Sequence, residues 1–198
     1  MRVVPAILTD DPQKLEELLI ETEKSGRFER VQIDFVDGEY TTNKSVGVED
    51  LPASRQGVRG WGLKLDAHLM VIQKNVQSYF EAAKQAGFER IIVQMESVSR
   101  PEDYTALALD IHSPVEAIEP YIEKLEYVVV MGIEPGFGGQ KFDPKTMEKI
   151  KRLDSLREQS KFKFRICVDG GVQKEHLADL EKAGADEAAV GVKRVLGW

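Results

Sequence analysis

Residues 164–191 read FRICVDGGVQKEHLADLEKAGADEAAVG, two short apolar runs separated by an amphipathic stretch. The runs Phe164–Val168 and Glu187–Gly191 are typical of parallel strands that are buried on both faces. Between them, Gln173–Ala183 has helical spacing and ends before Gly184, a residue that readily adopts the left-handed conformation of a helix terminus. The stretch therefore predicts a strand, a helix and a second strand.

The same alternation covers the rest of the chain. The predicted strands are Val3–Leu8, Arg30–Val36, Leu63–Leu69, Arg90–Met95, Ala106–Ile111, Tyr127–Gly132, Phe164–Val168 and Glu187–Gly191. The predicted helices are Asp11–Lys24, Asn75–Ala86, Pro114–Lys124, Asp143–Glu158 and Gln173–Ala183. Eight such strands predict an α/β fold, a (β/α)₈ TIM barrel formed by residues 1–198 as a single domain, with its active site at the C-terminal strand ends. An open doubly wound sheet is the alternative, but no GxGxxG follows the first strand.

The chain is short for this fold, because TIM barrels begin at roughly 200 residues. Only Ser97–Thr105 separates the fourth and fifth strands, so the helix after strand four should be missing or reduced to one turn. Gly38–Gly62 is expected to be a long loop with one short helix. Val192–Trp198 leaves only a stub of a helix after strand eight. The adjoining barrel wall must then be covered by something else or by a partner subunit. We expect exposed apolar wall that forms a subunit contact, which predicts a homo-oligomer, most simply a dimer.

Composition excludes several classes of protein. The 27 Lys and Arg residues are outnumbered by 34 Asp and Glu residues, giving a net charge of −7, which disfavours nucleic acids and anionic membranes as partners. Cys167 is the sole cysteine, so no intrachain disulfide can form. The N-terminal MRVVPAILTDDPQ is too polar for a signal peptide, and no apolar run approaches the roughly 18 to 20 residues of a membrane span. We expect a cytoplasmic protein.

Three ionisable residues lie near the ends of different predicted strands. Asp34, His68 and Asp169 occur in IDFVDG, LDAHLM and VDGG. Because strand ends converge in a barrel, the set could bind a divalent metal, or its two carboxylates could move protons on opposite sides of a substrate. The simpler alternative is that each residue caps a loop. His112 and His176 are weaker candidates, the first at a strand end and the second on a solvated helix.

Glycines mark the loops that follow strands six, seven and eight. Glycine lets backbone amides approach an anion closely, and this part of a barrel face commonly binds phosphate. Each glycine alone could be only a turn former. The glycines that carry the phosphate prediction are Gly138, Gly139, Gly170, Gly171 and Gly191.

Five motifs, taken in order, resemble the ribulose-phosphate 3-epimerase family from about Val4 to Gly191. They are PAIL, VQIDFVDGEYTTN, DAHLM, VMGIEPGFGGQKF and VDGGV. The resemblance implies a TIM barrel of the ribulose-phosphate-binding type. It also implies an isomerase that interconverts D-ribulose 5-phosphate and D-xylulose 5-phosphate by removing and replacing the proton on carbon 3.

The resemblance also implies roles for individual residues. Asp34 and Asp169 match two acid/base aspartates that also hold a divalent metal, which is Zn, Fe, Mn or Co in the family, and His68 matches a metal-binding histidine. Met70 and Met131 match methionines that form the floor of the substrate pocket. The positions matching the phosphate site are Gly138, Gly139, Gly170, Gly171, Gly191 and Val192. Asn43 matches a loop signature only and is assigned no catalytic role.

Four positions depart from the family pattern. Gln32 replaces a metal-binding histidine, and its amide oxygen, as a weaker fourth ligand, would favour harder cations such as Mn²⁺ or Mg²⁺. The other departures lie in or near the substrate pocket: Ala6 for serine, Val36 for methionine, and Val192 for serine. Three functions therefore remain open. They are a pentose-phosphate 3-epimerase with an altered metal shell, which we favour, an epimerase or isomerase of another ketose phosphate such as a hexulose 6-phosphate, and a non-catalytic phosphosugar-binding barrel.

Overall fold

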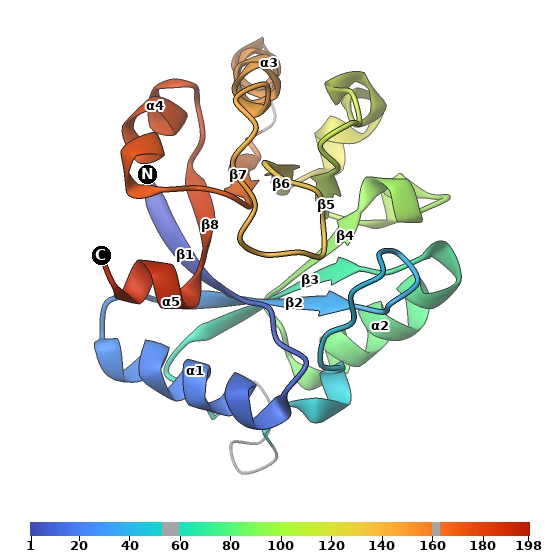
Figure 1. The fold of residues 1–198 in the computed structure, drawn as a ribbon. Helices are drawn as coiled ribbons and strands as arrows, with labels where there is room; N and C mark the ends of the chain where they lie inside the picture. The colour runs from blue at the N-terminus through green and yellow to red at the C-terminus, as the bar shows by residue number, and fades with distance from the viewer. Residues whose placement is uncertain (53–59, 160–162) are drawn as a thin grey trace.

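A computed structural model describes residues 1–52, 60–159 and 163–198 as a closed barrel of eight parallel strands, each paired with its neighbours in the sequence (Figure 1). The strands are β1 (Arg2–Ile7), β2 (Arg30–Val36), β3 (Lys64–Met70), β4 (Arg90–Gln94), β5 (Ala106–Leu109), β6 (Tyr127–Met131), β7 (Arg165–Asp169) and β8 (Glu187–Gly191). Every predicted strand is present, with ends displaced by no more than two residues. The predicted barrel is confirmed.

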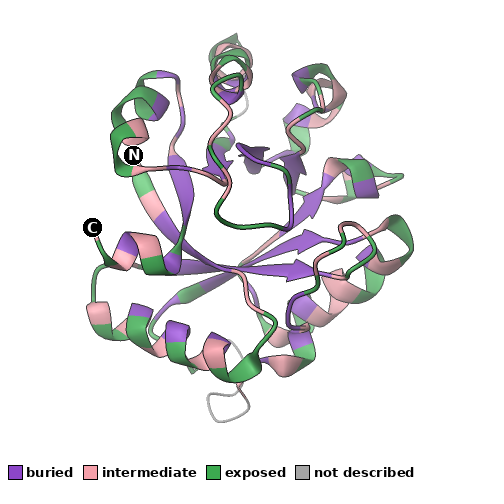
Figure 2. Ribbon diagram, in the orientation of Figure 1, coloured by how far each residue is buried: buried purple, intermediate pink, exposed green. Residues whose placement is uncertain are grey.

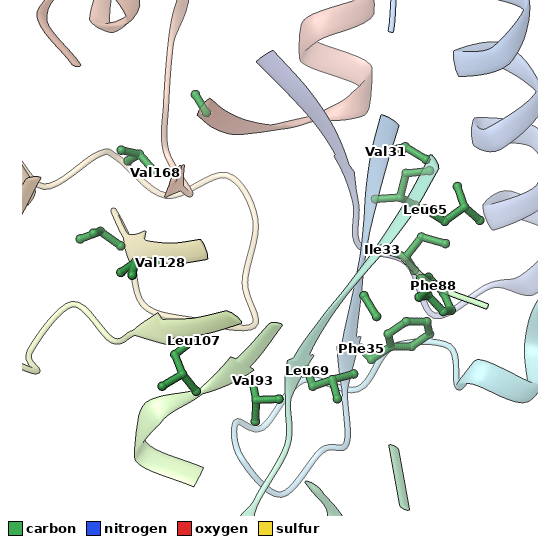
Figure 3. Close-up of a cluster of buried hydrophobic side chains, with 14 of the residues drawn as sticks. Val31, Ile33, Phe35, Leu65, Leu69, Phe88, Val93, Leu107, Val128 and Val168 are labelled. Carbon is green, nitrogen blue, oxygen red and sulfur yellow. The ribbon is translucent and has the colours of Figure 1, made fainter. Parts of the chain in front are cut away.

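Apolar side chains pack on both surfaces of the barrel wall, so the strands are almost wholly buried (Figure 2). On β2, Val31, Ile33 and Phe35 point to the helices and belong to the larger hydrophobic core (Figure 3). Gln32 and Asp34 alternate with them and point into the barrel, as the period of two in a strand requires. A second, smaller core inside the barrel includes Ala6 and Met131. This alternation places polar chemistry inside the barrel.

Among the described residues, the α-helices are fewer than the eight of a full (β/α)₈ barrel. They are α1 (Pro12–Ser25), α2 (Gln73–Ala86), α3 (Thr146–Gln159), α4 (Leu177–Lys182) and α5 (Val192–Leu196). Asp11 caps α1 by accepting hydrogen bonds from the backbone of Gln13 and Lys14, and Gly26 ends the helix with a φ of 60°. In the described ranges, no helix combines the length and the apolar character needed to cross a membrane.

Two predicted helices differ from the structure. Pro114–Lys124 forms two short 3₁₀-helices, η5 (Val115–Ala117) and η6 (Glu119–Lys124), because Pro120 has no amide hydrogen for the α-helical bond to residue 116. Gln173–Ala183 is divided into the 3₁₀-helix η7 (Lys174–His176) and α4.

Among the described residues, the segments after β2 and β4, which were expected to lack a full helix, have short 3₁₀ turns as their helical structure. Between β4 and β5 these are η3 (Met95–Ser97) and η4 (Pro101–Asp103). The long segment after β2 contains η1 (Val48–Asp50), and its residues 53–59 lie outside the described part of the chain.

The barrel wall beside β8 is better covered than we expected. Val192 and Val195 of α5 are buried, and Arg27 donates hydrogen bonds to the carbonyls of Val195 and Leu196, which ties the short helix to the end of α1. Among the described residues, Phe137 is the sole large hydrophobic side chain that is exposed. The expectation of an exposed apolar wall was therefore wrong, because this short helix packs closely enough to bury it.

Charged side chains close the N-terminal end of the barrel. Arg30 donates to both carboxylate oxygens of Asp66, at 2.5 and 2.7 Å, and Arg90 bridges Asp66 and Glu187 at 2.7 and 3.0 Å. The hydroxyl of Tyr127 donates to Glu187 at 2.8 Å. These buried charges are paired and hydrogen-bonded, as burial requires. The opposite end of the barrel carries the predicted site residues.

Candidate active site

Asp34, His68 and Asp169 meet inside the C-terminal end of the barrel. Asp34 and His68 are register partners on β2 and β3, and Asp169 comes from β7. The Nδ1 atom of His68 lies 3.4 Å from Asp34 Oδ1 and 3.1 Å from Asp169 Oδ2. His68 has no exposed surface, and the two aspartates are 8% and 7% exposed. The convergence expected from the strand ends is present.

The side chain of Gln32 belongs to the same cluster. Its Nε2 atom donates hydrogen bonds to Asp34 Oδ1 at 2.8 Å and Asp169 Oδ2 at 2.7 Å, and lies 3.3 Å from His68 Nδ1. Gln32 is 1% exposed. The amide therefore bridges two carboxylates that are buried beside each other, and it partly offsets their repulsion.

The ionisation of the cluster follows from burial and proximity. Burial raises the pKa of Asp34, because a charged carboxylate loses its hydration, while hydrogen bonds from His68 and Gln32 oppose that rise. Burial acts in the opposite direction on His68, but its hydrogen bonds to Asp169 and Asp34 outweigh it and raise the pKa of His68 to about 10. The two aspartates therefore favour the protonated form of His68.

The donor atoms of the cluster suit a divalent metal. Asp34, His68 and Asp169 each offer one ligand atom, and these atoms all lie within 4.8 Å of one another. Ligands bonded at about 2.0–2.2 Å to one ion lie about 3 Å apart, close to the 3.1 and 3.4 Å measured from His68 Nδ1. Carboxylate oxygens and an imidazole nitrogen also suit zinc, iron, manganese or cobalt. These three residues could therefore hold such an ion.

A cavity of about 430 Å³ opens beside the cluster. Asp34 and Asp169 line it together with Ala6, Met70 and Met131, the three residues predicted for the substrate pocket. All six predicted phosphate residues line the same cavity: Gly138, Gly139, Gly170, Gly171, Gly191 and Val192. One cavity thus contains both the carboxylates and the glycine loops.

The glycine positions are of two kinds. Gly171 has a φ of 70°, and a Cβ atom there would lie 2.6 Å from the backbone nitrogen of Phe142, so the turn itself requires glycine. A Cβ at Gly138, Gly139 or Gly191 would meet no atom within 4 Å. Packing therefore does not require glycine at Gly138 or Gly191, and both positions leave room for a ligand to approach the backbone.

Three cations that the sequence motifs did not single out also line this cavity: Lys14 of α1, and Lys193 and Arg194 of α5. The signal was the Lys-Arg pair two residues after Gly191, which can be recognised only when that strand end is known to border the cavity. Arg194 also donates a hydrogen bond to the carbonyl of Val172, which connects α5 to the loop after β7. Apart from the two aspartates, the charged residues that line the cavity are these three cations and Glu134.

The weaker candidates lie elsewhere. His112 is exposed, with its Nε2 atom 2.6 Å from Glu134 Oε1. His176 is half-buried rather than solvated, because its ring packs against Phe142 with centroids 5.1 Å apart. Asn43 donates to the carbonyl of Gly136 at 2.6 Å, which ties the loop after β2 to the glycine loop after β6.

Comparison with known proteins identifies the family. The sequence matches the model of the ribulose-phosphate 3 epimerase family over residues 2–193. The chain belongs to the ribulose-phosphate 3-epimerase family. It is 31% identical to the ribulose-phosphate 3-epimerase of Bacillus subtilis (strain 168), over 96% of this chain and 90% of that protein. It is 26% identical to the ribulose-phosphate 3-epimerase of Escherichia coli (strain K12), over 96% of this chain and 86% of that protein.

Solved structures agree on the fold of this ribulose-phosphate 3-epimerase family member. The chain is similar to 3-hexulose-6-phosphate synthase, with a TM-score of 0.61 and 15% identity over 96% of this chain and 90% of the other. It is also similar to thiamine phosphate pyrophosphorylase from Pyrococcus furiosus, with a TM-score of 0.56 and 14% identity over 96% and 84% of the two chains. At this identity the likeness concerns the barrel alone.

Proposed function

We propose that this chain is an isomerase that interconverts D-ribulose 5-phosphate and D-xylulose 5-phosphate by metal-assisted proton transfer at carbon 3. The observation that carries the proposal is the cavity that Asp34 and Asp169 share with the glycine loops. The two carboxylates come from strands that are not neighbours, β2 and β7. A substrate between them would present a different face to each. Membership in the epimerase family supports the same reaction.

In the proposed reaction, each aspartate serves one face of carbon 3. One carboxylate accepts the carbon 3 proton, which is weakly acidic because it lies beside a carbonyl group. The other aspartate, in its protonated form, donates a proton to the opposite face. A bound divalent cation would supply positive charge to the enediolate oxygens.

We assign the metal to Asp34, His68 and Asp169, with Gln32 as a weaker fourth ligand through its amide oxygen. Zinc, iron, manganese and cobalt all remain candidates for its identity. For Gln32 to bind the metal through its oxygen, its side-chain amide must rotate, because the amide nitrogen now faces the carboxylates. Such a ligand would favour Mn²⁺ or Mg²⁺ over softer ions.

We further assign the pocket floor to Met70 and Met131, which are each 3% exposed and would exclude water from the enediolate.

We assign the phosphate to the backbone of Gly138, Gly139, Gly170, Gly171, Gly191 and Val192. Their position in the cavity and the cations beside them support this assignment. A phosphate or sulfate soaked into crystals should be bound by these loops. An anion bound elsewhere on the barrel would contradict it.

Lys193→Ala should raise the KM for the sugar phosphate by about 3- to 10-fold with little change in kcat, as expected on losing about 1 kcal/mol of surface charge attraction. Lys193 lines the cavity but is exposed, so it should act on ground state and transition state alike. Steady-state kinetics at several salt concentrations tests this, because the difference between the variants should shrink as salt rises. Lys182→Ala, an exposed lysine of α4 beyond the cavity, is the matched control. Equal KM values in both variants would contradict the prediction.

The decisive assay separates the three candidate functions. Purified protein with ribulose 5-phosphate and added Mn²⁺, Fe²⁺, Co²⁺ or Zn²⁺ should form xylulose 5-phosphate, and in D₂O the product should carry deuterium at carbon 3. Turnover of a hexulose 6-phosphate alone would favour the second candidate. Its support is the departure from the family pattern at Ala6 and Val36, of which Ala6 lines the cavity with a small side chain. No turnover of either sugar with any metal would favour a phosphosugar-binding barrel.

We also propose that the protein acts in the cytoplasm as a homodimer whose ligand is the small sugar phosphate. The dimer rests on the segment between β4 and β5, where two short 3₁₀ turns replace a full helix; the covered wall beside β8 gives it no support. Light scattering across micromolar concentrations should give twice the mass of one chain. A mass that stays that of one chain over this range would contradict the dimer.

A further inference from the structure

The second ring nitrogen of His68 faces a glutamine that the sequence motifs did not single out. Nε2 of His68 lies 3.1 Å from the side-chain amide of Gln94, the last residue of β4. Neither residue has any exposed surface. In such a setting a polar atom must find its partner within the protein, because water cannot supply one.

The surroundings of Gln94 fix which way its amide points. Its far end lies 3.3 Å from the carbonyl oxygen of Ala108 and 3.1 Å from Asp110 Oδ1. Because a carbonyl can only accept, the amide nitrogen of Gln94 belongs at this end and donates to both oxygens. The amide oxygen then faces His68 and accepts a hydrogen bond from its Nε2. The proton on that ring nitrogen is thereby determined.

Asp110 is itself held in place from three sides. Tyr40 donates its hydroxyl hydrogen to Asp110 Oδ2 at 2.6 Å. The backbone of Asp110 donates to Glu96 Oε1 at 3.1 Å, and its carbonyl accepts from Lys149 Nζ at 2.8 Å. A hydrogen-bonded chain therefore runs from Tyr40 through Asp110 and Gln94 to His68.

We propose that Gln94 and Asp110 are positioning residues that keep a proton on His68 Nε2 and so direct Nδ1 towards Asp34 and Asp169. An imidazole binds a metal through the nitrogen that carries no proton, and a hydrogen bond from the other nitrogen selects which one that is. The inference rests on the proposed role of His68 as a metal ligand. It adds two residues, from β4 and the end of β5, to a site otherwise built from β2, β3 and β7.

The first test needs no metal. Nitrogen-15 NMR of the metal-free protein should show the Nε2 hydrogen of His68 as a slowly exchanging signal, easily assigned because the chain has three histidines. Gln94→Leu removes the acceptor at similar volume, so this signal should shift and lose its protection. An unchanged His68 signal in a folded Gln94→Leu protein would overturn the proposal.

The second test measures affinity for Mn²⁺ and Zn²⁺ by calorimetry. Gln94→Leu should weaken binding by about 10- to 100-fold, the usual effect of removing a group that orients a metal ligand. Asp110→Ala should weaken metal binding less than Gln94→Leu does. Asp110→Asn should keep the affinity of the unaltered protein, because an asparagine oxygen can still accept from Gln94. If Gln94→Leu fails to fold, Asp110→Ala and Asp110→Asn test the positioning role in its place. Lys182→Ala should bind as the unaltered protein does.

The outcomes separate this inference from the proposed function. Metal binding by the unaltered protein with equal affinity in Gln94→Leu or Asp110→Ala would overturn the positioning role alone. Absence of metal binding by the unaltered protein would overturn the proposed metal site, and the NMR signal of His68 would then decide whether Gln94 orients the ring.

Discussion

Asp34→Asn should lower kcat for epimerisation by about 100- to 10,000-fold, the range contributed by a positioned general acid or base. The amide that replaces the carboxylate has nearly the same shape but cannot accept the carbon 3 proton. It also weakens a charged metal ligand, so the larger end of the range is expected. Binding of the sugar phosphate should change little, because the change touches no glycine of the phosphate loops. Turnover and phosphate affinity, measured on the same preparation, test both statements.

Asp169→Asn provides a sharper comparison. If each aspartate serves one face of carbon 3, each variant retains the base for one epimer and has lost the base for the other. In D₂O, Asp34→Asn should then exchange the carbon 3 hydrogen of one sugar, and Asp169→Asn that of the other, while neither completes epimerisation. The double variant should be scarcely slower than either single one, since both groups act in one turnover. Exchange of the same epimer by both variants would contradict a division of roles.

The strands and the cluster of Asp34, His68 and Asp169 were predictable for one physical reason. Parallel strands buried on both faces leave continuous apolar runs, and closure of the barrel brings their C-terminal ends together whatever the helices do. A polar residue that interrupts such a run near its end is therefore identifiable in the sequence. The glycine loops follow by the same rule, because each directly succeeds a strand.

Other features depend on details that the pattern does not contain. A single proline, Pro120, converts a predicted α-helix into 3₁₀ turns by removing one hydrogen-bond donor. The burial of the wall beside β8 depends on Arg27, which donates hydrogen bonds to the carbonyls of Val195 and Leu196 at the end of α5. In the sequence, Arg27 precedes Val195 by 168 positions and Leu196 by 169. The sequence does not single out Gln94, because its contacts with His68 and Asp110 depend on the register of β3, β4 and β5. Glutamine at a strand end has no distinctive signature.

Gln32→His should tighten binding of Zn²⁺ or Co²⁺ by about 10- to 100-fold, because an imidazole nitrogen suits these ions better than an amide oxygen. In the present chain the Gln32 nitrogen donates to Asp34 at 2.8 Å and Asp169 at 2.7 Å. Turning the amide to offer its oxygen sacrifices both bonds. In Gln32→His, a ring nitrogen that carries no proton makes no such hydrogen bonds, so metal binding has none to break. Epimerase activity with zinc or cobalt should rise with affinity.

Gln32→Leu is the matched control, because it removes the amide without adding a ligand. It leaves Asp34, His68 and Asp169 as the only ligands, and it also removes the donor that bridges the two carboxylates, so their repulsion should favour a divalent cation. Calorimetric titration of the three proteins with Zn²⁺, Co²⁺ and Mn²⁺, paired with the epimerase assay, distinguishes a ligand gained from an amide lost. If Gln32→His tightens binding no more than Gln32→Leu, the imidazole is not a ligand. If metal affinity is also unchanged and no variant turns over the sugar, the chain is a phosphosugar-binding barrel, because the carboxylates would then have no metal site to complete.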